Sequence, residues 1–142
     1  MKLSLDLARQ IVRDVHAQAT TLQLRPLTVV VLDGGGHVLV AERADGSPIG
    51  SFEIARGKAY GALALGMGSR RIMERAEAQP YFVTAAAAAL AGRLIPVPGG
   101  ILVRDGDGNA IGALGVSGDA SDSDEAVGVA AISAVHLIPQ PS

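Results

Sequence analysis

The 142-residue sequence contains no cysteine and no tryptophan, and aromatic residues make up only 3% of it. Without cysteine, the chain has no disulfide, no thiolate metal site and no cysteine nucleophile. Its formal net charge is -2, so it shows no excess of basic residues, and few aromatic rings are available to stack on bases. Nucleic acid is therefore not an expected partner.

Long apolar runs are also missing. Gly, Arg or Asp interrupts every candidate stretch before it reaches the ~20 apolar residues of a membrane span. The chain turns amphipathic directly after Met1 and lacks the apolar core of a signal peptide. The alanine run 85–89 is predicted to be helical core material. We therefore expect a cytoplasmic protein without a membrane partner.

Small side chains dominate the remaining composition. Hydrophobic residues account for 49% of the chain, and there are 18 glycines. A core built from Ala, Val, Leu and Ile gains less per residue than an aromatic core. Further burial by association of identical chains is therefore expected, which predicts a homo-oligomer. The length fits a single domain over residues 1–142.

The hydrophobic pattern predicts an α+β domain in which helices pack on an antiparallel sheet. Ser4 and Ser51 are the expected N-caps of the first two helices, and close packing is expected at Gly112 and Gly115. The tail after Leu137 is expected to be frayed. The predicted elements are a helix over 4–23, strands over 27–32 and 37–42, helices over 51–66, around 72–73 and over 81–92, strands over 101–104 and 110–117, and a helix from 119–123 to about 135.

Four segments of the sequence form a family pattern in chain order. They read VVLDGGGHVLV (30–40) followed by RADG (43–46), KA (58–59), PVPGGI (96–101), and IGALGVSG (111–118) followed by DE (124–125). Together they resemble the GlcG/HbpS-like family, which includes haem-binding PduO C-terminal-like domains. The resemblance implies a profilin-like three-layer α/β/α sandwich with an antiparallel sheet of about five strands. Since the hydrophobic pattern alone predicts four strands, a fifth would have to come from a segment assigned to a loop.

The resemblance implies a small-molecule-binding protein, with haem as a candidate cofactor and His16 as its candidate iron ligand. His16 lies on the first helix, where PduO-type domains hold haem iron. The alternative is a histidine at the edge of the core that hydrogen-bonds a neighbour. His37 follows a glycine turn, where a bond to the turn backbone is the alternative to a site role. His136 is expected to be exposed.

A second candidate group lies on the second helix and on the loop before the third predicted strand. Lys58, together with Pro98, Gly99 and Gly100, is a candidate site for the carboxylate of a small organic acid or for haem propionates. The alternative is a solvated cationic helix face. The sequence departs from the family pattern at 60–61, where Tyr60 and a glycine follow the KA pair.

That departure leaves a catabolic enzyme open as another function. An isomerase, lyase or hydrolase on the same fold would draw its acid–base groups from Lys58, Tyr60, Glu53 and His37. A third reading is a structural subunit without a ligand pocket. Asp124 and Glu125 are explained as carboxylates at a helix N-terminus.

Overall fold

The computed structural model describes all residues 1–142, and the chain forms five helices and five strands. In chain order the elements are α1 (Leu5–Thr21), β1 (Thr28–Asp33), β2 (Val38–Arg43), α2 (Ser51–Leu65), α3 (Ser69–Ala78), α4 (Pro80–Ala89), β3 (Gly100–Arg104), β4 (Ala110–Ser117), α5 (Ser121–Ala134) and β5 (Ile138–Gln140). Both predicted hairpins and all five predicted helices are therefore present, with shifts of a few residues at their ends.

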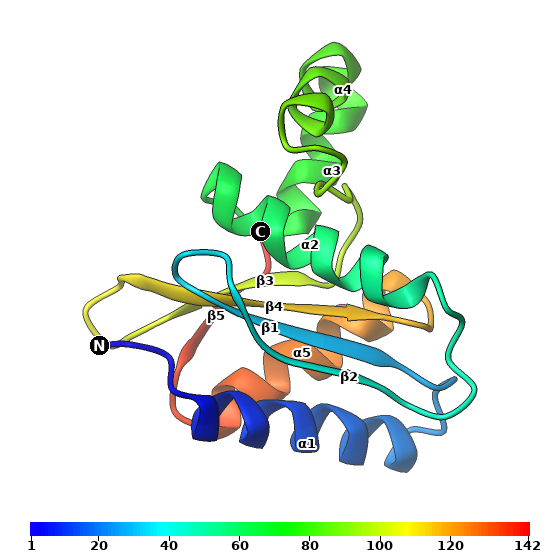
Figure 1. The fold of residues 1–142 in the computed structure, drawn as a ribbon, viewed down its shortest axis with the longest axis vertical. Helices are drawn as coiled ribbons and strands as arrows, with labels where there is room; N and C mark the ends of the chain where they lie inside the picture. Colours follow the sequence, from blue (N-terminus) through cyan, green and yellow to red (C-terminus); the bar gives the residue numbers. More distant parts are fainter.

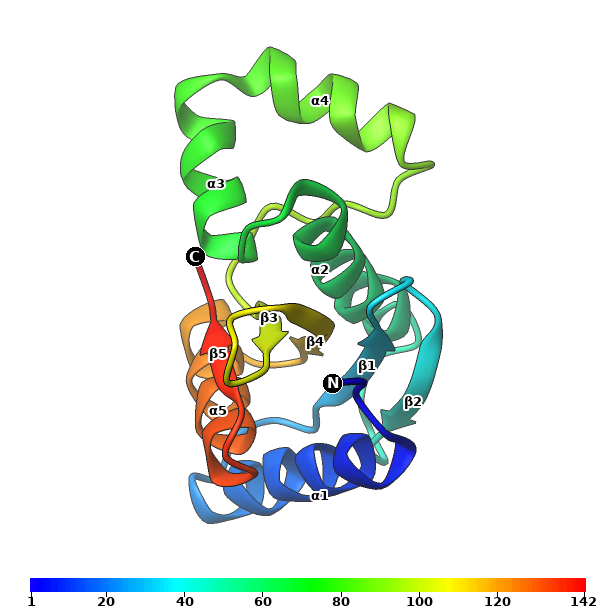
Figure 2. The same cartoon turned by 90° about the vertical axis from the view of Figure 1, so that its left-hand side faces the viewer.

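The five strands form one antiparallel sheet in the order β2-β1-β4-β3-β5. The central strands are buried on both faces, as the β-branched run of β1 predicts. Helices α1 and α5 cover one face of the sheet, and α2 covers the other (Figures 1 and 2). The predicted α+β class and the three-layer α/β/α sandwich are confirmed.

The fifth strand lies where the sequence predicts a frayed tail, and that prediction is wrong. β5 pairs with the outer side of β3, with Leu102 opposite Gln140. The preceding Leu137 is buried and anchors the segment. Pro139 is tolerated because an edge strand has one side without ladder bonds.

Helix α1 begins as predicted, whereas α2 does not. The Ser4 hydroxyl accepts a hydrogen bond from the Leu7 amide at 3.2 Å and caps α1. For α2 the N-cap is Gly50, and Ser51 is already the first helical residue. The reason is a tight turn in which the Ser51 amide donates to the Pro48 carbonyl, so the chain enters the helix one residue early.

Helices α3 and α4 form an arm that projects from the α2 side of the body (Figures 1 and 2). Arg70 fixes its base, because Nε donates to Glu125 of α5 at 3.0 Å. α4 packs against α3 and against no other helix or strand. Of its ten residues only Val83 is buried, so the alanine run is helical but is not core material. That prediction is wrong because the helix lies outside the sandwich.

Two glycines of β4 allow α2 and β1 to approach the strand closely, as predicted. A Cβ atom at Gly115 would overlap the Ala55 carbonyl of α2, and one at Gly112 would overlap the Leu32 carbonyl of β1. No helix of the structure has the length and apolar character needed to cross a bilayer.

Candidate functional site

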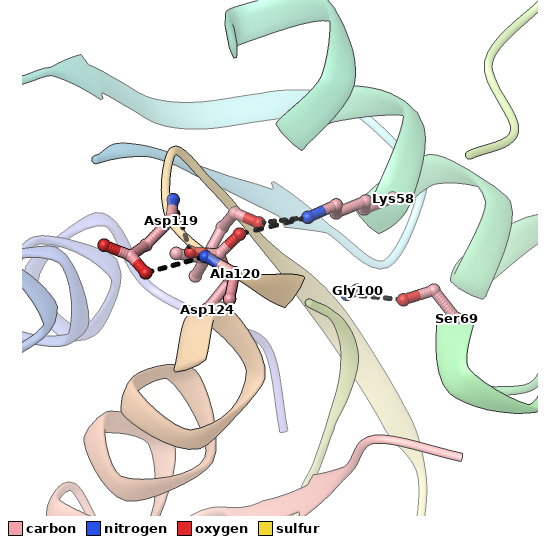
Figure 3. Close-up of polar contacts among 7 residues, drawn as sticks. Lys58, Ser69, Gly100, Asp119, Ala120 and Asp124 are labelled. Atoms are coloured by element: carbon pink, nitrogen blue, oxygen red, sulfur yellow. Dashed lines mark hydrogen bonds and ion pairs between the residues drawn. The ribbon is translucent and has the colours of Figure 1, made fainter. Parts of the chain in front are cut away.

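Lys58 is a buried residue of α2, with 2% of its side chain exposed. Its ammonium group donates to the Val116 carbonyl of β4 at 2.8 Å and faces the Asp124 carboxylate of α5 at 3.4 Å (Figure 3). Asp124 is equally buried, with 1% exposed. The pair therefore joins the two outer layers of the sandwich at the end of β4, and it closes Lys58 off from solvent.

Burial and charge act in opposite directions on this pair. Removal from water lowers the pKa of Lys58 and raises the pKa of Asp124, and the attraction between the two charges opposes both shifts. The second oxygen of Asp124 accepts a hydrogen bond from the Asp119 amide at 3.1 Å (Figure 3). With these contacts the pair connects α2 to β4 and α5 in the interior of the chain.

The loop of Pro98 and Gly99, together with Gly100 at the start of β3, does lie beside Lys58. A side chain at Gly99 would place its Cβ 3.0 Å from the Lys58 ammonium nitrogen, and φ at Gly99 is +118°. However, all three of these residues are buried. The Gly100 amide donates to the Ser69 hydroxyl at 2.6 Å (Figure 3), and the Gly99 carbonyl accepts from the Val116 amide. These polar groups already have partners within the chain.

The four acid–base candidates lie in different surroundings. His37 is 82% exposed and folds back onto Asp33 of its own turn, with 3.3 Å between Nδ1 and Oδ1. Glu53 is exposed near the start of α2, whereas Lys58 is buried. Tyr60 packs beneath the guanidinium of Arg93. The structure does not bring these side chains together in one cavity.

His16 lies beside a hollow of about 480 Å³ between the end of α1 and the β2 edge of the sheet. Its ring is held in place because α1 packs on the sheet through the core residues on either side, among them Val12, Val15 and Ala19. The other lining residues are Ala19, Thr20, Leu24, Arg25, Pro26, Leu27, Glu42, Arg43, Ala44 and Asp45. The hollow thus combines an apolar floor with charged side chains at its rim.

The outer nitrogen of the His16 ring has no hydrogen-bond partner. Nε2 is buried and lies 3.3 Å from Oε1 of Glu42, but the geometry between them is not that of a hydrogen bond. Glu42 is 58% exposed and belongs to the edge strand β2. The one charged group beside Nε2 is therefore a largely exposed carboxylate at the edge of the sheet.

Sequence reasoning missed the partners of both groups. The sequence predicts Asp124 at a helix N-terminus without indicating its partner, and it does not place Glu42 beside His16. The alternation of side chains along β2 partly indicates the position of Glu42. Glu42 lies opposite Val29, whose side chain faces α1, so Glu42 lies on the same face of the sheet as α1. Nothing in the local sequence indicates that Lys58 and Asp124 pair.

Known structures show the same arrangement of helices and strands. A haem complex of PduOC is 28% identical, with a TM-score of 0.86 over 96% of this chain and 97% of that chain. The crystal structure of HbpS is 26% identical, with a TM-score of 0.79 over 95% of this chain and 90% of that chain.

Sequence comparison agrees with the structural one. A 15.0 kDa protein of Citrobacter freundii, described by its position in the dhaT-dhaS intergenic region, is 30% identical over 122 residues, or 86% of this chain and 84% of that protein. The family model described as "Haem degrading protein HbpS-like" matches residues 3–133. The chain therefore belongs to the HbpS-like family.

Proposed function

We propose that this protein binds a small planar, acidic molecule, with haem as the leading candidate, in the hollow beside His16. The observation that carries the proposal is the buried Nε2 of His16 at this hollow, whose contact with the Glu42 carboxylate at 3.3 Å lacks hydrogen-bond geometry. Buried polar atoms without partners are rare in proteins and call for an explanation. An iron ligand is one explanation, because haem iron is commonly held by a single histidine.

The residues present fit haem in three respects. The hollow has about 480 Å³, which falls within the roughly 300–1,000 Å³ of small-molecule sites. Leu24 and Pro26 offer apolar contact to a porphyrin plane. Arg25 and Arg43 stand at the rim, where guanidinium groups pair with propionate carboxylates. When bound, haem would supply the redox and oxygen chemistry that the side chains lack.

An optical titration with hemin tests this function. The wild-type protein is expected to give a saturable shift of the Soret band, and His16→Ala is expected to lose that shift. His37→Ala and His136→Ala are matched controls, because these exposed histidines are the only others in the chain. Binding that is unchanged in His16→Ala, or equally reduced in all three variants, would contradict the proposal. Following the same samples over time shows whether bound haem is degraded, as the family description suggests.

We also propose that α4 contacts a second copy of this chain. No residue from 79 to 92 is charged, and most of the helix is exposed, including Tyr81 at 71%. An apolar helix of this kind is normally buried. In sedimentation analysis Ala88→Glu is expected to lower the molecular mass of the assembly, whereas Ala17→Glu, at an exposed alanine of α1, leaves it unchanged. Equal masses for both variants, or a monomeric wild type, would count against this role of α4.

A further inference from the structure

A second group of polar side chains lies on the other face of the sheet, around Tyr60 of α2. The ring of Tyr60 packs against the glycine turn between β1 and β2, since a Cβ at Gly36 would lie 3.0 Å from its Cε2 atom. The guanidinium carbon of Arg93 lies 4.4 Å from the centre of the same ring. Tyr60 is thus held between a backbone turn and a cation that arrives from the segment after α4.

Two arginines, Arg93 over this ring and Arg56 one turn earlier on α2, have no acidic partner. Arg93 donates only to the Leu90 carbonyl, at 3.3 Å, and forms no ion pair. Arg56 lies one helical turn before Tyr60, so both side chains leave α2 on the same face. Nε of Arg56 is buried and has no hydrogen-bond partner. Among the arginines, only Arg25 and Arg70 form ion pairs. Arg25 pairs with Asp119 on the other side of the fold, and Arg70 forms its pairs at the base of the arm.

A small hollow opens beside the same tyrosine. It has about 160 Å³ and is lined by Gly34, Gly35, Gly36, Tyr60, Leu63 and Ala64. A cavity of roughly 150 Å³ is large enough for a benzene ring. Its walls are glycine backbone, an aromatic ring and aliphatic side chains, which suit a flat apolar group.

We infer that Tyr60, Arg56 and Arg93 form a binding site for a small aromatic carboxylate, separate from the His16 hollow. The ring of the ligand occupies the hollow against Tyr60, and its carboxylate accepts hydrogen bonds from the arginines. Guanidinium groups match a carboxylate with two parallel donors. Such an acceptor gives the buried Nε of Arg56 the partner that the chain itself does not supply.

The test follows the tyrosine ring signals in NMR spectra of protein made with ¹³C-labelled tyrosine. The chain has only two tyrosines, and Tyr81→Phe assigns their signals. Titration with benzoate at constant ionic strength is expected to shift the Tyr60 signals saturably and to leave the exposed Tyr81 unchanged. Benzamide, which has the same ring without the charge, is expected to bind at least about 10-fold more weakly.

Variants then test the two arginines. Arg93→Gln and Arg56→Gln are expected to weaken benzoate binding by about 10-fold each, whereas Arg71→Gln, at an exposed arginine of α3, leaves it unchanged. Arg93→Lys keeps the charge and is expected to fall between these results. Equal binding of benzoate and benzamide, or unchanged binding in the Arg56 and Arg93 variants, overturns the inference. A Tyr60 signal that shifts with protein concentration and not with benzoate also overturns it. The hydrogen-bond acceptor for the arginines would then belong to a second copy of the chain.

Discussion

Replacing Lys58 with methionine is expected to lower the free energy of unfolding by about 3–5 kcal/mol, the range measured when one partner of a buried ion pair is removed. The variant leaves the Asp124 carboxylate buried without its cation, and the Val116 carbonyl loses its donor. Chemical denaturation measures the change. Lys2→Met, at an exposed lysine, is the control and is expected to stay within about 0.5 kcal/mol of wild type.

A double variant separates the loss of pairing from the loss of packing. Lys58→Met with Asp124→Leu removes both charges, and buried pairs replaced by apolar side chains are often tolerated. Most of the stability is therefore expected to return, with a clear coupling energy in the double-mutant cycle. Simple addition of the two single losses would show that the pair is not a coupled unit.

The pH dependence of Lys58→Met has a definite sign. Burial raises the pKa of Asp124 in the folded protein, and in this variant Lys58 no longer opposes the shift. A carboxyl with a raised folded-state pKa binds its proton more readily in the folded state than in the unfolded state. Stability therefore increases relative to wild type as the pH falls from neutral toward that pKa, and it is lost again as the pH rises through it.

Gly115→Ala is expected to cost about 3 kcal/mol, at the upper end of the usual overpacking range. The added methyl group would overlap the Ala55 carbonyl, a backbone atom of α2 that has no rotamer with which to move aside. Separation of α2 from the sheet would also disturb the Lys58 connection. Gly106→Ala is the matched control, because a Cβ there meets nothing within 4 Å. Similar stability of the two variants in thermal unfolding would contradict the packing argument.

Local sequence patterns are sufficient to predict most of the helices and strands. The β-branched run of β1, the glycine turn that follows it and the Ser4 cap each act within a few residues, and all three are found in the structure. β5 is different, because three residues that include Pro139 carry no strand signal of their own. Its pairing depends on β3, more than thirty residues earlier in the chain.

The candidate site was predicted less completely than the fold. His16 lines a hollow to which Glu42 and Arg43 come through the pairing of β2 with β1. Lys58 is buried against Asp124, a partner 66 residues away in sequence. A lone lysine on a helix is usually solvated, so local reasoning favours the wrong environment. Pairing of this kind is determined by the tertiary fold.

The central claim, that haem binds beside His16, is tested most directly by the position of the iron. Ferric hemin broadens nearby amide signals in a ¹H–¹⁵N spectrum of the isotopically labelled protein. We predict that broadening is strongest at the hollow, at Thr20, Glu42 and Ala44. The second half of α2, from Tyr60 to Leu65, and the Gly99–Gly100 loop lie away from the hollow and are expected to stay sharp. Broadening centred on Tyr60 or on that loop, with sharp signals around His16, would contradict the account.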